Sequence, residues 1–174
     1  DPSGATDRGN LRKALALFEQ AGWSVQDGVM KDAAGKPFVF DILLAAGATD
    51  SETVVNIYAQ ALRQLGIVPT ITSVDGPQYK ERTNKYAFDM TWLTISLSLS
   101  PGNEQTLYWG SAGVTEPGRR NLMGMNSPAA EAMIATIVSS NDADAFIQAT
   151  QALDRVLLAG RYVIPVWYSK VGRI

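Results

Sequence analysis

The side chains best suited to hold a polar ligand gather in residues 96–126, a stretch without regular periodicity. Four short polar side chains at its start offer hydroxyl and amide groups: Ser96, Ser98, Ser100 and Asn103. These groups form hydrogen bonds without selecting one particular partner side chain. The stretch also follows a predicted strand, and α/β folds place their ligand sites where sheet strands end. We therefore expect it to line a ligand cleft.

Larger side chains of the same region each leave two interpretations open. Glu104 is the only acid between residues 89 and 116, and either binds a ligand cation or caps a short turn. Trp109 either touches ligand or anchors the loop to the protein body, and Trp92, on the preceding strand, belongs either to the core or to the cleft wall. Asn121 either braces the loop or touches ligand. The adjacent pair Arg119-Arg120 either lies in solvent or forms a fork for an anion.

The composition excludes several classes of chemistry. The 174 residues contain no His and no Cys, which removes His-based triads, thiolate nucleophiles and Cys-bound metals. The phosphate-binding Walker A motif and the GxSxG nucleophile motif are both absent. Lys plus Arg number 15 against 17 Asp plus Glu, so the chain lacks the excess of positive charge that is typical of nucleic-acid-binding proteins. We therefore expect no enzyme activity, no metal, no cofactor and no nucleic-acid partner.

The first half of the chain predicts alternating strands and helices. A helix over residues 10–22 ends at a glycine, and a hairpin over residues 23–37 turns at an Asp-Gly pair. Residues 38–45 form an apolar strand, a capping-box sequence at residues 49–52 opens a helix, and residues 67–74 form the next strand. This order is typical of a βαβ unit with parallel strands.

The second half predicts one more strand and a helical end. A third strand over residues 88–95 runs into the long loop, and a helix begins at Ser127-Pro128. A further helix is capped by Asn141-Asp142 and ends at Gly160, and a last strand covers residues 162–168. The fold class is therefore α/β, a mixed sheet flanked by helices in one domain over residues 1–174. The start lacks a signal peptide and an initiator Met, which favours an excised piece of a longer protein.

Several short motifs occur in the order found in one known family. They read KAL…AGW at residues 13–23, LRQLGI at 62–67, YAFDM at 86–90, NLMG…SPAAEAMI at 121–134, and ALDRVL…IPVWY at 152–168. Together they resemble the family 5 extracellular solute-binding proteins of ABC importers, the dipeptide- and oligopeptide-binding type. Residues 96–122, with SLSLSPGNEQ, YWGS and PGRRNL, resemble the Yej-type branch linked to oligopeptide and microcin C uptake.

The resemblance implies a lobe of the type II periplasmic-binding fold. The chain would be most of the C-terminal lobe of a two-lobed receptor, with the N-terminal lobe missing. Its expected partners are a peptide or peptide-like ligand, that lobe and the membrane permease of an ABC transporter, and its expected location is the periplasm. An extended peptide presents backbone N–H and C=O groups, which suit the serines and Asn103. The alternatives are a sensing or interaction domain without a transport role and, less favoured, an enzyme domain.

One departure from the family pattern concerns the ligand ammonium. Dipeptide-type members carry an Asp for it in the loop after the third strand, whereas residues 94–100 here contain no acid. Glu104 is the nearest candidate. Otherwise the missing lobe holds the ammonium, or the ligand is not a free-amino peptide.

Overall fold

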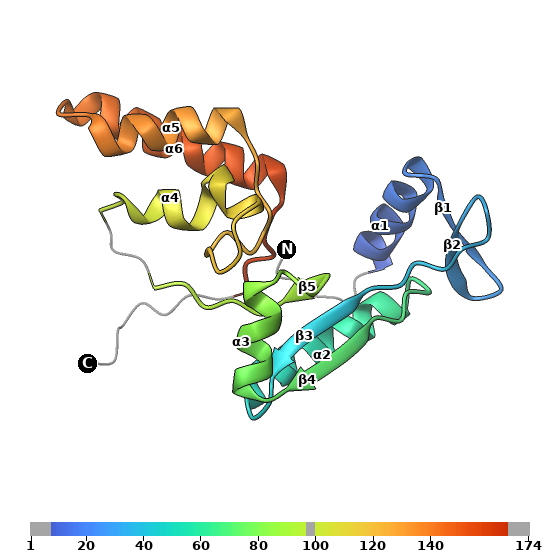
Figure 1. The fold of residues 1–174 in the computed structure, drawn as a ribbon. Coiled ribbons are helices and arrows are strands. Elements are labelled where there is room, and N and C mark those ends of the chain that lie inside the picture. The colour runs from blue at the N-terminus through green and yellow to red at the C-terminus, as the bar shows by residue number, and fades with distance from the viewer. Residues whose placement is uncertain (1–7, 97–99, 167–174) are drawn as a thin grey trace. The chain divides into compact units, whose positions relative to one another are not determined.

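The computed structural model describes residues 8–96 and 100–166, and these gather into two compact units (Figure 1). Within the described residues, the first unit consists of residues 8–82 and 87–94. The second consists of residues 83–86 and 95–166. The chain that the sequence predicts as one domain thus contains more than one packed core.

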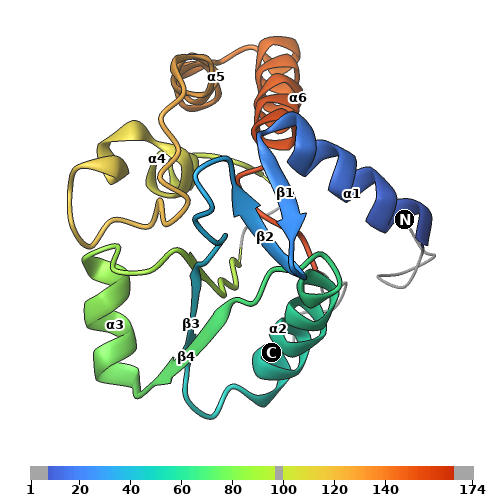
Figure 2. The same cartoon turned by 90° about the vertical axis from the view of Figure 1, so that its right-hand side faces the viewer.

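The first unit begins with a helix and a hairpin, as the sequence predicts. Helix α1 spans Arg8–Gln20 and contacts strand β1, Trp23–Gln26, which pairs antiparallel with β2, Val29–Asp32 (Figure 2). The turn residues Asp27 and Gly28 have φ angles of 51° and 79°. Positive φ at both positions defines the tight turn whose twist matches two antiparallel strands. The Asp-Gly signal therefore fixes the register of this hairpin.

A parallel βαβ unit forms the centre of the first unit. Strand β3, Asp41–Ala45, pairs in parallel with β4, Thr70–Val74, and helix α2, Thr49–Arg63, connects them. The three central residues of β3 are buried, which confirms a strand covered on both faces. Alternate β3 side chains pack against α2 in a core that includes Ile42, Leu44 and Val55.

The start of α2 differs from the predicted capping box. The N-cap is Ala48, one residue before Thr49, and no side chain caps the helix. Glu52 instead lies one turn inside the helix, and its carboxylate accepts a 3.4 Å hydrogen bond from the Ser73 hydroxyl of β4. Tertiary contact with the neighbouring strand has replaced the local reciprocal bonds of a capping box.

The predicted third strand is much shorter in the structure. Helix α3, Gly76–Asn84, leads to β5, which covers only Met90–Thr91 and pairs in parallel with β3. At the position before β5, the Asp89 side chain accepts a 2.8 Å hydrogen bond from the backbone N–H of Asp41. At the start of β3, the Asp89 carboxylate thus takes the place of a strand carbonyl as the acceptor for the Asp41 N–H.

The second unit is helical. Inside the predicted irregular loop lie helix α4, Glu104–Trp109, and a 3-10 helix, Ser111–Val114. Helix α5, Pro128–Ser139, and helix α6, Ala143–Gly160, then pack against each other (Figure 1). Their predicted caps are confirmed, because the side chains of Ser127 and Asp142 accept hydrogen bonds from backbone N–H groups of the first turns.

Two further expectations need correction. The strands do not form one mixed sheet, since the described residues hold an antiparallel hairpin and a separate parallel sheet of order β4-β3-β5. Residues 162–166 form no strand, and the remainder of that predicted strand, 167–168, lies outside the described residues. An apolar run forms a strand only where a partner strand satisfies its backbone, and residues 162–166 pair with none of the described strands.

Candidate functional site

The candidate segment is defined here as the described part of residues 96–126, which lies in the second unit. Its first helix, α4, has one buried and one accessible side. Gln105 and Trp109, four residues apart, are buried, whereas Glu104 and Tyr108 are partly accessible. Residues four apart in a helix share a face, so this pattern orients α4 on the unit. It also makes Glu104 and Tyr108 neighbours on the side that solvent reaches.

Glu104 is held in place by its own turn. Its Oε1 accepts hydrogen bonds from the backbone N–H of Gly102, at 2.9 Å, and from the Gln105 amide, at 3.2 Å. Bonds from its own backbone N–H and from that of Gly102 lower the pKa of the Glu104 carboxyl below its usual value. The side chain therefore remains ionised at neutral pH, and its bonds to the Gly102 N–H and the Gln105 amide support the turn-capping interpretation.

Asn121 braces the segment, because its side chain hydrogen-bonds backbone groups on both sides of it in the chain. It is fully buried, and its Nδ2 donates to the carbonyls of Gly110 and Met125 at 2.9 and 2.8 Å. Its Oδ1 accepts from the N–H of Met125 at 3.0 Å. Gly113 packs so closely that a Cβ there would lie 2.5 Å from the Asn121 Cβ. Of the two roles left open for Asn121, the structure thus shows the bracing one.

The two tryptophans lie in cores. Trp109 is 7% exposed and packs with Met125, Ala130 and Ile134, so it anchors the loop to the protein body. Trp92 is half-buried in the first unit against the α2–sheet core, and its carbonyl accepts a 2.8 Å hydrogen bond from the Tyr79 hydroxyl. Trp109 therefore offers no open aromatic face for ligand stacking, and a place for Trp92 in the cleft wall stays a prediction.

The short polar side chains are mostly on the surface. Ser96, Ser100 and Asn103 are exposed, and Asn103 is the N-cap of α4 without a side-chain capping bond. Ser98 lies outside the described residues. Sequence reasoning therefore found the accessible groups of this segment, and their contact with a ligand stays a prediction.

The remainder of the segment is tied to residues 83–86 of the same unit. Gly118 donates its backbone N–H to the Asn84 carbonyl at 2.9 Å, and the Tyr86 hydroxyl donates to the Glu116 carbonyl at 3.1 Å. Burial raises the pKa of Tyr86, which keeps this hydroxyl protonated as a donor. Arg119 forms an ion pair with Glu116, so one member of the arginine pair is neutralised.

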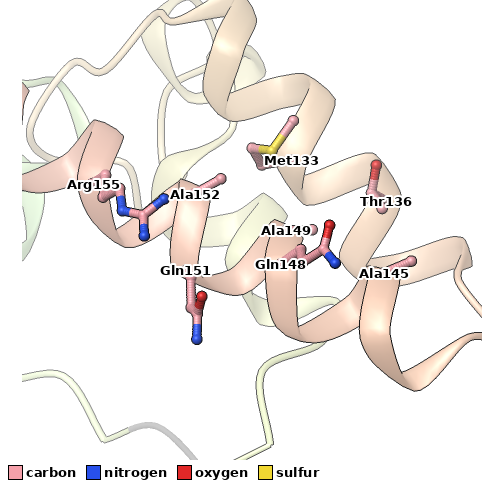
Figure 3. A pocket seen from close by; sticks show the side chains of 8 residues that line it. All are labelled: Met133, Thr136, Ala145, Gln148, Ala149, Gln151, Ala152 and Arg155. Carbon is pink, nitrogen blue, oxygen red and sulfur yellow. The ribbon is translucent and has the colours of Figure 1, made fainter.

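A separate open pocket of about 470 Å³ lies between α5 and α6 (Figure 3). It is lined by Met133, Thr136, Ala145, Gln148, Ala149, Gln151, Ala152 and Arg155. None of the predicted site residues lines it. Across the described residues, no group of three or more His, Cys, Asp or Glu side chains could hold a metal, and no helix is both long and apolar enough to cross a membrane.

Comparison with known proteins defines the class. Residues 1–116 match the bacterial extracellular solute-binding proteins, family 5 middle region, and the chain belongs to this family. It is 42% identical to the protein y4wM of Sinorhizobium fredii over 100% of this chain. It is 38% identical to the probable peptide-binding protein YejA of Agrobacterium fabrum over 94% of this chain. The peptidoglycan-binding protein YepA of the same organism is 35% identical over 97% of this chain. The chain spans only 26–27% of these relatives.

Solved structures confirm the type II periplasmic-binding fold. The oligopeptide-binding protein AppA of Bacillus subtilis, in complex with a nonapeptide, superposes with a TM-score of 0.76 at 21% identity, over 87% of this chain and 30% of its own. A mannohexaose-bound oligopeptide-binding protein of Thermotoga maritima gives a TM-score of 0.80 at 22% identity, over 91% and 31%. At these identities the likeness establishes the α/β lobe fold that the sequence predicts.

Proposed function

We propose that the chain is most of the C-terminal lobe of a receptor that captures oligopeptides or peptide-like compounds for an ABC importer. The observation that carries this proposal is membership of the family 5 solute-binding proteins over residues 1–116. Relatives named as peptide-binding and the fold shared with oligopeptide-binding proteins support the ligand class. The receptor would work in the periplasm, deliver ligand to the permease subunits, and catalyse no reaction.

Within this lobe, Glu104 is the group proposed to bind the ligand ammonium. Its Oε1 is fixed by Gly102 and Gln105, so the carboxylate is oriented before ligand arrives. Ser96, Ser100 and Asn103, with Ser98, would bind the peptide backbone. A carboxylate that is already ordered loses less side-chain entropy on binding than a free one.

The test is calorimetric titration of the full-length protein with alanine peptides of two to four residues. We expect Glu104→Gln to weaken binding about tenfold or more, the scale of a charge-assisted hydrogen bond. Glu19→Gln, which changes an equally charged, exposed residue of α1, is the matched control and should bind normally. Unchanged affinity in Glu104→Gln would leave the ammonium to the missing lobe, and absence of binding by any peptide would contradict the proposed function.

A further inference from the structure

The turn that ends α3 holds a tyrosine in a backbone conformation that favours glycine. Tyr86 has a φ of 54°, in the left-handed region. Its N–H donates to the Thr83 carbonyl at 3.2 Å, and the N–H of Ala87 donates to the Arg82 carbonyl at 2.9 Å. These two bonds define the Schellman motif, in which the left-handed position is usually a glycine because a Cβ is strained there.

Helix α2 ends in the same motif with the usual residue. The Gly66 N–H donates to the Arg63 carbonyl at 3.0 Å. The N–H of the next residue, Ile67, donates to the Leu62 carbonyl at 3.1 Å. The two helix ends thus share one hydrogen-bond pattern and differ in the residue at the left-handed position. A tyrosine kept at a strained position indicates that its side chain has a role that glycine could not fill.

The Tyr86 side chain reaches the exposed part of the candidate segment, residues 114–120, named here the exposed loop. Its hydroxyl donates a 3.1 Å hydrogen bond to the Glu116 carbonyl, and the Gly118 N–H donates to the Asn84 carbonyl at 2.9 Å. Both bonds lie within the second unit. The turn after α3 therefore holds the exposed loop at two points, once through a side chain and once through the backbone.

The exposed loop continues into groups that contact α4. At the end of the loop, the Arg120 guanidinium carbon lies 5.8 Å from the centre of the Tyr108 ring. The next residue, Asn121, bonds the Gly110 carbonyl directly after α4. Tyr108 follows Glu104 by one helical turn, so the two residues share one side of α4. The exposed loop therefore adjoins the side of α4 that carries the proposed ammonium-binding group.

We propose that Tyr86 is a positioning residue for peptide binding, which holds the exposed loop beside α4 before ligand arrives. The inference rests on the proposed function and adds to it a residue that lies outside the candidate segment. Tyr86 acts through the loop and does not itself contact the peptide. A loop that is already ordered costs less entropy on binding, and the apparent affinity falls with the fraction of molecules in which the loop is released.

The test is calorimetric titration of the full-length protein with tri-alanine. We expect Tyr86→Phe, which keeps the ring and removes only the hydroxyl, to bind about three- to tenfold more weakly, the scale of one hydrogen bond. Tyr86→Gly should keep the helix end, because glycine is the usual residue of the motif, and should lose at least as much affinity. Arg161→Gly is the matched control, since it relaxes a left-handed residue with a φ of 51° at the end of α6 and should bind normally.

A second measurement separates positioning from a general loss of stability. Amide hydrogen exchange reports how often each N–H is released from its hydrogen bond. In Tyr86→Phe we expect faster exchange at Gly118, in the exposed loop, and unchanged exchange at Met125, whose N–H is bonded to Asn121. A variant that only destabilised the fold would accelerate exchange at both positions.

Each outcome bears on a defined claim. Unchanged tri-alanine affinity in Tyr86→Phe would overturn the inference and leave the proposed function standing. Equal acceleration of exchange at Gly118 and Met125 would also overturn it, because Tyr86 would then act on the whole fold. Equal losses of affinity in Arg161→Gly and Tyr86→Gly would attribute the effect to the backbone change and contradict a role for the side chain. If tri-alanine does not bind the unaltered protein, the proposed function fails and the inference fails with it.

Discussion

Asn121 satisfies three backbone groups at once and joins the end of α4 to Met125. Truncation would remove all three bonds, and of these groups the Gly110 carbonyl would keep another donor, the backbone N–H of Gly113. We expect Asn121→Ala to lower the free energy of unfolding by about 2–4 kcal/mol, since buried unsatisfied polar groups are costly. Chemical denaturation measures the loss. Asn126→Ala changes an exposed position of the same segment and should alter stability little. Equal losses of stability in the two variants would contradict the bracing role of Asn121.

The turn around Glu104 predicts a pH dependence. Its backbone hydrogen bonds lower the pKa of the folded-state carboxyl relative to the unfolded chain. The resulting stabilisation is therefore fully present above the unfolded-state pKa and is lost as the pH falls through the lower folded-state pKa. Nuclear magnetic resonance titration of the Glu104 carboxyl should show this lowered pKa, and Gln105→Leu, which removes one donor, should raise it. A carboxyl that titrates at its ordinary value would refute the assignment.

At the scale of elements, the junction after α2 depends on Gly66. Its φ is +77°, and a Cβ would lie 2.9 Å from the Gly28 oxygen and from the Met30 nitrogen. The Gly66 carbonyl also accepts a 3.0 Å hydrogen bond from the N–H of Met30, which joins the end of α2 to the hairpin. Close approach of two backbones therefore adds to the conformational requirement for glycine.

We expect Gly66→Ala to destabilise the chain by about 3–5 kcal/mol, since left-handed strain and a backbone clash act together. Gly47→Ala is the matched control, with φ of +83° and nothing within 4 Å of its Cβ position. It should cost only the strain, about 1–2 kcal/mol. Thermal and chemical denaturation of both variants measure the difference. Equal losses would show that the contact with the hairpin contributes nothing.

At the scale of the whole molecule, the proposed lobe should be able to fold alone but should bind peptide weakly without its partner lobe. Each described unit has its own buried core, and we expect the 174 residues to unfold cooperatively when expressed alone. Peptide affinity should nevertheless be at least about 100-fold lower than in the full-length receptor, because closure of a second lobe excludes water and strengthens polar contacts. Calorimetric titration of both forms with tri-alanine tests this, with circular dichroism confirming the fold. Equal affinities would refute a two-lobed binding site.

The sequence by itself determined the local structure wherever short-range signals agree. The Asp27-Gly28 turn, the Ser127 and Asp142 caps and the βαβ order appear in the structure because each depends on neighbouring residues or on apolar periodicity. The family also followed from ordered motifs, and residue matching over 1–116 confirms it.

Only the tertiary structure decided which polar and aromatic side chains of residues 96–126 remain accessible. Trp109 and Asn121 have the residue types of ligand contacts, yet both are buried. Trp109 packs against α5, and Asn121 bonds the backbone of Gly110, 11 residues before it, and of Met125. Arg120 is exposed, and the tertiary structure places it beside the Tyr108 ring, which no local pattern predicted. The third strand was likewise limited to two residues by its pairing with β3. Burial and pairing are properties of contacts between distant segments, and no local pattern encodes them.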